Sequence, residues 1–280
     1  MKFLNLIFIA FTFSIYLCNA ETKDNSLFKD TLIKNNEKIV DFSKEQGTQR
    51  FLCYNVRHCE GMDSIINYDR IANIISTLDG DFVALQELDS ASTRSKGINM
   101  VKELGDKLGM HAYFGAAISY KGGKYGVGIL SKKPAQNIHQ YKLSGSEPRT
   151  FLIAEYEDFL IISVHLDLME SNRVESVEII TEKIKALNKK AYLAGDFNED
   201  KVEGAMFTAF KKDWTIVSPI KNTFPTTGGP TKCIDFTLTY NPAGKYEIYK
   251  ADVIYNLPGI NVSVSSDHFP LYIDFKQNEY

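Results

Sequence analysis

The sequence has no feature that by itself assigns a class of function. After residue 20 it has no apolar run near the roughly 18 residues of a membrane-spanning helix. Its formal net charge is only −3, so it has no overall positive charge that would attract nucleic acid. It also lacks the Gly-x-Ser-x-Gly segment of many serine hydrolases. A polyanionic substrate would therefore have to be bound by a local patch or through metal ions.

Cysteine is scarce and irregularly spaced. Cys18 lies in the N-terminal apolar run, and only Cys53, Cys59 and Cys233 follow it, without a Cys-x-x-Cys pair. This disfavours a zinc site or a disulfide framework, although an exported protein permits one bridge among the three. Cys53 and Cys233 lie in strand-like runs, which predicts that their side chains are packed in the interior.

The first twenty residues resemble a targeting segment. A single basic residue, Lys2, precedes an apolar stretch that ends at the small residue Ala20. This pattern predicts a secretory signal peptide over residues 1–20 and a secreted or periplasmic protein. A lipoprotein anchor at Cys18 is the alternative, and the bulky Tyr16 and Leu17 before it disfavour that reading. Once the signal is cleaved, we expect no stable membrane insertion.

The remaining chain divides into a leader and one domain. Residues 21–49 are polar with a weak helical pattern, which predicts a leader or a loosely docked helix. From residue 50 to residue 280, apolar strands and amphipathic helices alternate. The predicted helices are 68–78, 100–108, 171–190 and 202–210. Two separated groups of helices among many short strands joined by tight turns predict a layered α/β sandwich, whose two halves are consistent with pseudo-symmetry.

Polar residues recur where the apolar strands end. Asn55, Glu87, His165, Asp196 and Asn198 end such runs. Asp235 interrupts one, and Asp267 and His268 precede one. An ionised group among apolar neighbours is costly unless it is paired or bound to a metal, so a shared site is expected. In Gly195-Asp196-Phe197-Asn198 an acid and an amide stand two positions apart, and extended backbone would aim both the same way.

Six segments around these residues resemble the endonuclease/exonuclease/phosphatase superfamily, the deoxyribonuclease-like metal-dependent phosphohydrolases. In family order they are Tyr54-Asn55-Val56-Arg57, Leu85-Gln86-Glu87, Ser163-Val164-His165-Leu166, Gly195-Asp196-Phe197-Asn198, Ile234-Asp235-Phe236 and Ser266-Asp267-His268-Phe269-Pro270. The resemblance covers residues 50–275. It implies a four-layer α/β/β/α sandwich of two mainly antiparallel sheets, a Mg²⁺ or Mn²⁺ cofactor, and in-line attack of water on a phosphoester.

The resemblance also implies roles for the residues on the metal and water side. Glu87 would be the main metal ligand, helped by Asn55 and Asp267, whose oxygens suit a hard divalent cation. Asp196 would position or deprotonate the attacking water, and Asn198 would hold the phosphate.

Four further residues complete the implied site. Asp235 would pair with His268 and fix its tautomer. His268 and His165 would then flank the charge that develops in the transition state. Arg149 matches a phosphate-contacting arginine of some members, and its guanidinium suits a bidentate contact.

Residues outside these motifs are interpreted structurally. His58, His111 and His139 are predicted to be surface or satisfied half-buried groups. Residues 121–124, Lys-Gly-Gly-Lys, are predicted to form a hairpin turn. Tyr125 and Trp214 are weaker candidates for substrate stacking.

The sequence thus predicts an exported phosphodiesterase that acts on nucleic acid or a small phosphodiester, most simply as a monomer. A phosphomonoesterase for inositol-phosphate or phospholipid-type substrates is an alternative, because loops outside the motifs set the substrate. A catalytically silent module that binds phosphate or sugar is a third hypothesis, which the presence of Glu87 and the histidines disfavours.

Overall fold

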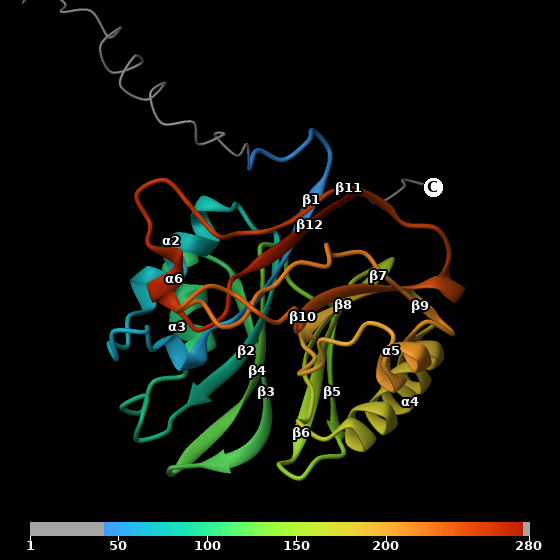
Figure 1. Ribbon diagram of the computed structural model, residues 1–280, viewed down its shortest axis with the longest axis horizontal. Coiled ribbons are helices and arrows are strands. Elements are labelled where there is room, and N and C mark those ends of the chain that lie inside the picture. The colour runs from blue at the N-terminus through green and yellow to red at the C-terminus, as the bar shows by residue number, and fades with distance from the viewer. Residues whose placement is uncertain (1–41, 277–280) are drawn as a thin grey trace, which may run out of the picture. The chain divides into compact units, whose positions relative to one another are not determined.

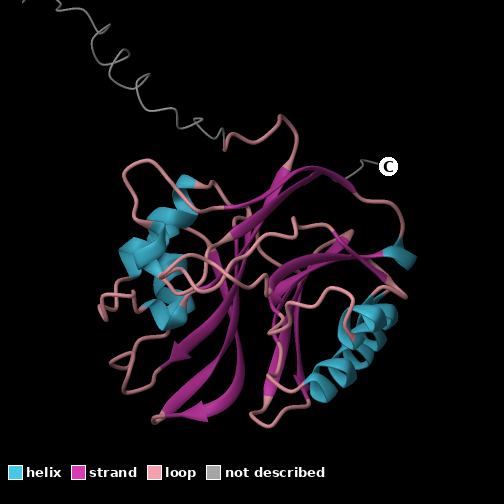
Figure 2. Cartoon of the chain, in the orientation of Figure 1, coloured by secondary structure: helices cyan, strands magenta, loops and turns pink. Residues whose placement is uncertain are grey.

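The computed structural model describes residues 42–276, which form four layers (Figure 1). Helices α2 (Tyr68–Thr77), α3 (Met100–Leu108) and α6 (Val262–Ser265) cover one sheet. Helices α4 (Glu170–Leu187) and α5 (Ala205–Phe210) cover the other. Figure 2 shows both sheets lying between the two groups of helices. The predicted α/β/β/α sandwich is confirmed.

The predicted signal peptide, residues 1–20, lies outside the described residues. So does most of the predicted leader, apart from residues 42–48, which contain neither helix nor strand. There Lys44 forms ion pairs with Asp79 and Asp81, at 2.7 and 2.8 Å. Between residues 42 and 276, no helix is long and apolar enough to span a membrane.

Each sheet has six strands. The first runs in the order β11-β12-β1-β2-β4-β3 and the second in the order β5-β6-β7-β8-β10-β9. The strands of the first sheet are β1 (Gln49–Asn55), β2 (Phe82–Ser90), β3 (His111–Tyr120), β4 (Gly123–Ser131), β11 (Glu247–Val253) and β12 (Leu271–Lys276). Those of the second are β5 (Asn137–Leu143), β6 (Arg149–Glu155), β7 (Phe159–His165), β8 (Lys190–Asp196), β9 (Trp214–Ile216) and β10 (Asp235–Tyr240).

The two sheets repeat one pattern, as the predicted pseudo-symmetry requires. Strands β1 and β2 are parallel and are joined through α2, and β7 and β8 are parallel and are joined through α4. Every other described strand pair is antiparallel. Since parallel neighbours end at the same edge, each sheet brings two carboxyl-terminal strand ends together. These two edges carry the predicted site residues.

Alternation along the strands divides the interior into two hydrophobic clusters. In β6, Leu152 and Ala154 pack with residues of the first sheet, whereas Phe151 and Ile153 pack with residues of α4 and α5. This is the two-residue period of a strand buried on both faces. Replacing Leu152 by Ala would cost about 2–5 kcal/mol of stability. The cores hold the strand ends rigidly in place.

Several local features differ from or match the sequence expectations. Helix α4 begins at Glu170, one residue before the predicted start, and it has no side-chain cap. The turn between β3 and β4 is a hairpin turn, as predicted, with positive φ at Lys121 and Gly122. Cys53, Cys59 and Cys233 are buried free thiols, so none of these three forms a disulfide in the structure.

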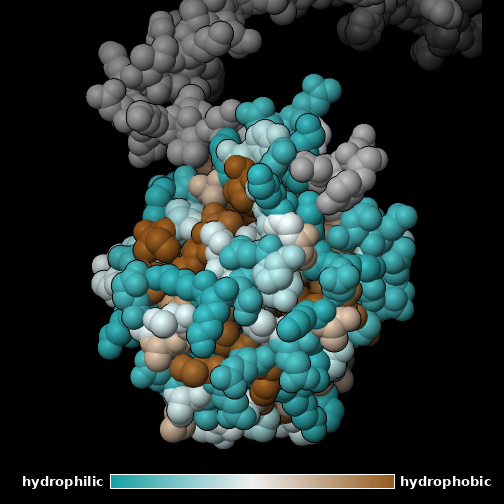
Figure 3. Space-filling model, turned by 90° about the vertical axis from the view of Figure 1, so that its right-hand side faces the viewer, coloured by the Kyte–Doolittle hydropathy of each residue, from teal (hydrophilic) through white to brown (hydrophobic). Residues whose placement is uncertain are grey.

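The face of the molecule in Figure 3 is mostly hydrophilic, with apolar patches between the polar side chains. Among the exposed apolar residues are Leu168 and Met169, in the segment that leads from β7 into α4. Leu168 also lines the cavity described next.

Candidate active site

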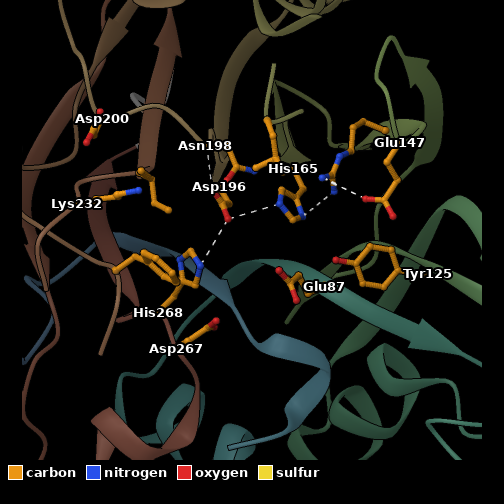
Figure 4. A pocket seen from close by; sticks show the side chains of 14 residues that line it. Glu87, Tyr125, Glu147, His165, Asp196, Asn198, Asp200, Lys232, Asp267 and His268 are labelled. Atoms are coloured by element: carbon orange, nitrogen blue, oxygen red, sulfur yellow. Dashed lines mark hydrogen bonds and ion pairs between the residues drawn. The ribbon is translucent and has the colours of Figure 1, made fainter. Parts of the chain in front are cut away.

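A cavity of about 610 Å³ lies where the carboxyl-terminal edges of the two sheets meet (Figure 4). Seven of the predicted site residues line it: Glu87, Arg149, His165, Asp196, Asn198, Asp267 and His268. The other two, Asn55 and Asp235, are buried and contact these residues from behind. The structure therefore brings all nine predicted residues together.

Glu87 reaches the cavity through an irregularity in β2. The pairing of β2 with β4 shifts register between Leu85 and Leu88, and Glu87 has a φ of 61°. A bulge of this kind adds a residue to one strand and redirects its side chain. The prediction that Glu87 marks the end of its strand is therefore wrong, because β2 continues to Ser90 and the bulge orients the carboxylate.

Asp196 and Asn198 face the cavity because of a turn. Strand β8 ends at Asp196, and Asn198 has a φ of 52° with its N–H donating to Asp196 Oδ1 at 2.9 Å. The expected extended backbone is thus wrong, although both side chains do line the same cavity. Gly195 is required before them, since a Cβ there would lie 2.0 Å from the Val164 carbonyl oxygen.

Asn55 connects the acids of the two sheets. Its Nδ2 donates to Asp196 Oδ2 at 3.0 Å and to Glu87 Oε1 at 3.2 Å, and its Oδ1 accepts from the Arg57 N–H at 3.1 Å. In this orientation the amide presents nitrogen to the carboxylates. Direct metal ligation by Asn55 stays a prediction, which requires the side-chain amide to rotate.

Two imidazoles face one oxygen of Asp196. His165 Nε2 lies 3.5 Å and His268 Nε2 lies 3.6 Å from Asp196 Oδ2. On its other side, His268 Nδ1 is 2.8 Å from Asp235 Oδ2, which is the pairing the sequence predicts. His165 Nδ1 instead lies 3.5 Å from Arg149 Nη1. On their Nδ1 sides, the two rings therefore have neighbours of opposite charge: a carboxylate beside His268 and a guanidinium beside His165.

These neighbours separate the pKa values of the two histidines. Burial lowers the pKa of His165 to about 4, and the charges of Arg149 and His268 reinforce burial against the opposing effect of Asp196. Burial also opposes the charge of His268, but Asp235 and Asp196 outweigh it and raise the pKa of His268 to about 10. At neutral pH the site therefore holds one neutral imidazole and one imidazolium.

Comparison with known families agrees with this geometry. Residues 52–268 match the model of the Endonuclease/Exonuclease/phosphatase family. The chain belongs to this family. Members of the family are hydrolases that act on phosphoesters. None of the curated proteins matches the sequence significantly.

Solved structures share the fold at low sequence identity. An endonuclease/exonuclease/phosphatase from Bacteroides vulgatus is 19% identical with a TM-score of 0.69, over 82% of this chain and 99% of that one. A mannosyl-6-phosphatase from Bacteroides thetaiotaomicron is 19% identical with a TM-score of 0.67, over 82% and 100%. TDP2 from D. rerio, solved with a single-stranded DNA product, is 18% identical with a TM-score of 0.62, over 83% and 100%.

Two acids on the side of the first sheet, Glu87 in β2 and Asp267 in the loop before β12, fit a divalent cation of the kind this family uses. Burial raises the pKa of Glu87, and the nearby charges of Asp267 and Asp196 raise it further against the hydrogen bond from Asn55. The nearest basic groups are not in hydrogen-bond contact, since Arg57 Nε is 3.8 Å from Asp267 Oδ2 and His58 Nδ1 is 4.0 Å from Glu87 Oε2. Clustered, poorly compensated carboxylates are the hard ligands that Mg²⁺ and Mn²⁺ prefer.

A second group of possible metal donors consists of Asp196, Asp235 and His268, with one ligand atom of each lying within 4.8 Å of the others. Two of its atoms are already engaged, because His268 Nδ1 and the Thr223 hydroxyl both bond to Asp235 Oδ2. The other oxygen of Asp235, Oδ1, has no hydrogen-bond partner among the described residues, so the choice of Glu87, Asn55 and Asp267 as metal ligands stays a prediction.

His58, which was interpreted as a surface or half-buried group, is half-buried beside the site, with its Nε2 3.3 Å from Glu60 Oε2. Its Nδ1 is buried without a hydrogen-bond partner among the described residues, and it lies on the side of Glu87. The short turn η1 (Arg57–Cys59) has φ values of 45°, 44° and 58°, a left-handed conformation that costs roughly 1–2 kcal/mol per non-glycine residue. No periodic pattern in the sequence signals such a turn.

The two candidates for substrate stacking, Tyr125 and Trp214, lie in different parts of the structure. Tyr125 lines the cavity, together with Glu147 and Lys232, which the sequence analysis did not single out. Trp214 is buried and donates its Nε1–H to the Thr181 hydroxyl, so it is a core residue.

Proposed function

We propose that this protein is an exported, metal-dependent phosphoesterase that hydrolyses phosphodiesters by in-line attack of water. One observation carries the proposal. Asp196 Oδ2 lies between the Nε2 atoms of His165 and His268, in one cavity with the carboxylates of Glu87 and Asp267. A base, two imidazoles and a cation-binding pair of acids form the set that phosphoester hydrolysis requires.

Glu87 and Asp267, with Asn55 behind them, would hold the Mg²⁺ or Mn²⁺ ion. When bound, that ion would supply Lewis-acid polarisation of a phosphoryl oxygen and partial neutralisation of its charge. The raised pKa of Glu87 supports this assignment, since a cation would relieve the unfavourable burial of its carboxylate.

The remaining residues would act on the water and on the phosphoryl group. Asp196 would orient the attacking water and accept its proton, because its Oδ2 is aimed between the imidazoles. His268, held protonated by Asp235, would stabilise the negative charge that develops in the transition state. His165 would donate a hydrogen bond as a neutral ring.

Two polar groups at the cavity wall would position the phosphoryl group. Arg149 is almost fully buried beside His165, and its guanidinium can contact two phosphoryl oxygens at once. Asn198 has its backbone and its Nδ2 fixed by Asp196 and by the Leu166 carbonyl oxygen, so its position at the cavity wall is constrained.

A phosphomonoesterase is the second candidate. Three basic side chains, Arg149, Lys232 and His268, line the cavity among its five carboxylates, and they could contact the dianion of a monoester once a cation is bound.

The test is hydrolysis of bis-(p-nitrophenyl) phosphate, p-nitrophenyl phosphate, plasmid DNA and sphingomyelin by protein treated with EDTA and then supplied with Mg²⁺ or Mn²⁺. We expect activity to disappear in EDTA and to return with either metal. Full activity in EDTA would contradict the metal-dependent mechanism. The relative rates on diester and monoester decide between the two candidates.

Export rests on the signal-like first twenty residues. Expression of the full chain followed by mass spectrometry of the exported protein is expected to give an N-terminus at Glu21. A lipid-modified Cys18 at the N-terminus would instead establish the anchored form.

A further inference from the structure

A smaller recess opens from the active-site cavity beside Glu87. It has a volume of about 170 Å³ and shares Glu87, Tyr125 and Glu147 with the cavity. Its other lining residues are Arg94, Ile118 and Tyr120. Figure 4 shows the Tyr125 hydroxyl directed toward Glu87, with Glu147 above the ring in this view. We refer to these six residues as the leaving-group recess.

The wall of the recess is fixed by buried contacts. Arg94 donates from Nε and Nη2 to the two carboxylate oxygens of Asp89, at 2.9 and 2.8 Å, and the Asp89 side chain is completely buried. The Arg94 guanidinium lies over the ring of Tyr120, with Cζ 4.6 Å from the ring centroid. The backbone N–H of Thr93 donates to the Lys121 carbonyl oxygen at 2.8 Å, which ties the Arg94 loop to the β3–β4 hairpin.

The charges of the recess disfavour an additional anion. Asp89 compensates the charge of Arg94, whereas Glu87 and Glu147 present carboxylates to the space. Glu147 has one ion-pair partner, Arg149, at 3.2 Å, and its side chain is 48% exposed. With Arg94 paired to Asp89, the recess has no uncompensated basic side chain to hold a second phosphate or the backbone of a nucleic acid.

Hydroxyl groups and the face of a ring do fit. The carboxylates are acceptors for O–H donors, and the Tyr125 hydroxyl and Arg94 Nη1 make no hydrogen bond to other residues between 42 and 276. The rings of Tyr120 and Tyr125 stand 6.0 Å apart at 52°, so they form an aromatic corner. The volume is well below the roughly 300–1,000 Å³ of sites for drug-sized ligands, which limits the occupant to about one ring.

We propose that the leaving-group recess binds a neutral polyhydroxylated ring, of monosaccharide or inositol size, as the alcohol part of the phosphoester. This inference rests on the proposed phosphoesterase activity, and a preference for a hexose monoester would select the second candidate, the phosphomonoesterase. In the reaction a water oxygen bonds to phosphorus, the bond from phosphorus to the ester oxygen of the polyol breaks, and that oxygen takes up a proton. The products are the free polyol and the phosphate that remains.

The first experiment compares substrates. With Mg²⁺ present, we expect kcat/KM for a hexose 6-phosphate to exceed that for glycerol 3-phosphate, p-nitrophenyl phosphate and a DNA oligonucleotide by at least about tenfold. Equal rates on ring and acyclic substrates, or a preference for the oligonucleotide, would overturn the recess proposal and leave the proposed function standing.

A binding measurement keeps the two proposals separable. Saturation-transfer NMR of the metal-free protein with free mannose, glucose and myo-inositol is expected to show binding that Tyr120→Leu abolishes. If no phosphoester is hydrolysed but this binding is seen, the proposed function fails and the recess stands. Absence of binding to every ring would contradict the recess whatever the activity.

The second experiment uses matched tyrosine variants. Tyr120→Leu removes one ring of the aromatic corner, and we expect KM for the hexose phosphate to rise about tenfold with little change in kcat, the scale of one lost stacking contact. Tyr249, which is 51% exposed on β11, is the control, and Tyr249→Leu should change neither constant. An equal fall in kcat for every substrate would show that Tyr120 supports only the structure.

Discussion

The two sheets share one strand pattern yet supply different chemistry to the same cavity. The first sheet provides Asn55 at the end of β1 and Glu87 within β2. The second provides His165 and Asp196 at the ends of β7 and β8. Both pairs come from a parallel strand pair crossed over by a helix, and so from equivalent places in the two halves.

Local irregularity accounts for the difference. A bulge turns Glu87 inward on the first side, whereas a turn places Asn198 beside Asp196 on the second. The first side therefore has acids whose charge is poorly compensated, and the second has a carboxylate between two imidazoles. The fold determines where the site lies, and single departures from regular strand geometry determine which polar groups each side presents to the cavity.

The largest effect is expected from removal of the second side's acid–base groups. Asp196→Ala and His268→Ala should each lower kcat/KM at least about a hundredfold, the usual scale for general acid–base groups. Steady-state kinetics with saturating Mg²⁺ measures this. Asp106→Ala, at an exposed position on α3, is the control and should match the wild type. A His268→Ala protein with full activity would contradict the mechanism.

Removal of the negative charge of Glu87, on the first side, should weaken metal binding. Glu87→Gln keeps the shape of the side chain but removes its charge, so we expect the affinity for Mn²⁺ to fall about 10–100-fold, by analogy with changes to metal-site residues. Titration calorimetry measures the affinity directly. His165→Ala, on the opposite side, should leave it within about twofold. Equal losses of metal affinity in both variants would remove the distinction between the two sides.

The pH profile should sharpen the contrast between the two imidazoles. Asp235 and Asp196 hold the pKa of His268 at about 10, so Asp235→Asn should lower that pKa. If protonated His268 is the active form, the alkaline limb of kcat/KM moves to lower pH. The same raised pKa stabilises the folded wild type below about pH 6.5, and this contribution is lost as the pH rises toward about 10. An unchanged alkaline limb in the variant would exclude His268 as its origin.

The smallest catalytic effect is expected at the contact between the sheets. Gln86 Nε2 donates to the Ser163 hydroxyl at 3.2 Å, and that hydroxyl donates to the Leu85 carbonyl oxygen at 3.1 Å. Ser163→Ala leaves a buried amide unsatisfied, so it should cost about 1–3 kcal/mol in urea unfolding. Its kcat/KM should stay within about twofold of the wild type. A larger catalytic loss would mean that the sheets move relative to each other during turnover.

The layered fold and the residues of the site were predictable from local patterns. Alternating strands and helices indicated the sandwich, and polar residues at the ends of apolar strands marked the site, for instance His165 at the end of β7. The orientation of Glu87 was not predictable, because a bulge depends on pairing with β4. The difference between the pKa values of His165 and His268 was not predictable either. It arises from the charges of Arg149, Asp196 and Asp235, which lie on other strands.

The amide of Asn55 has a geometric consequence. Because its Nδ2 bonds at once to Glu87 on the first sheet and to Asp196 on the second, the separation of these two carboxylates is limited by two hydrogen bonds to a single nitrogen. Bonds of 3.2 and 3.0 Å to this one nitrogen keep Glu87 Oε1 and Asp196 Oδ2 no more than about 6.2 Å apart. The longer side chain of glutamine would push the carboxylates to a different spacing without changing any charge.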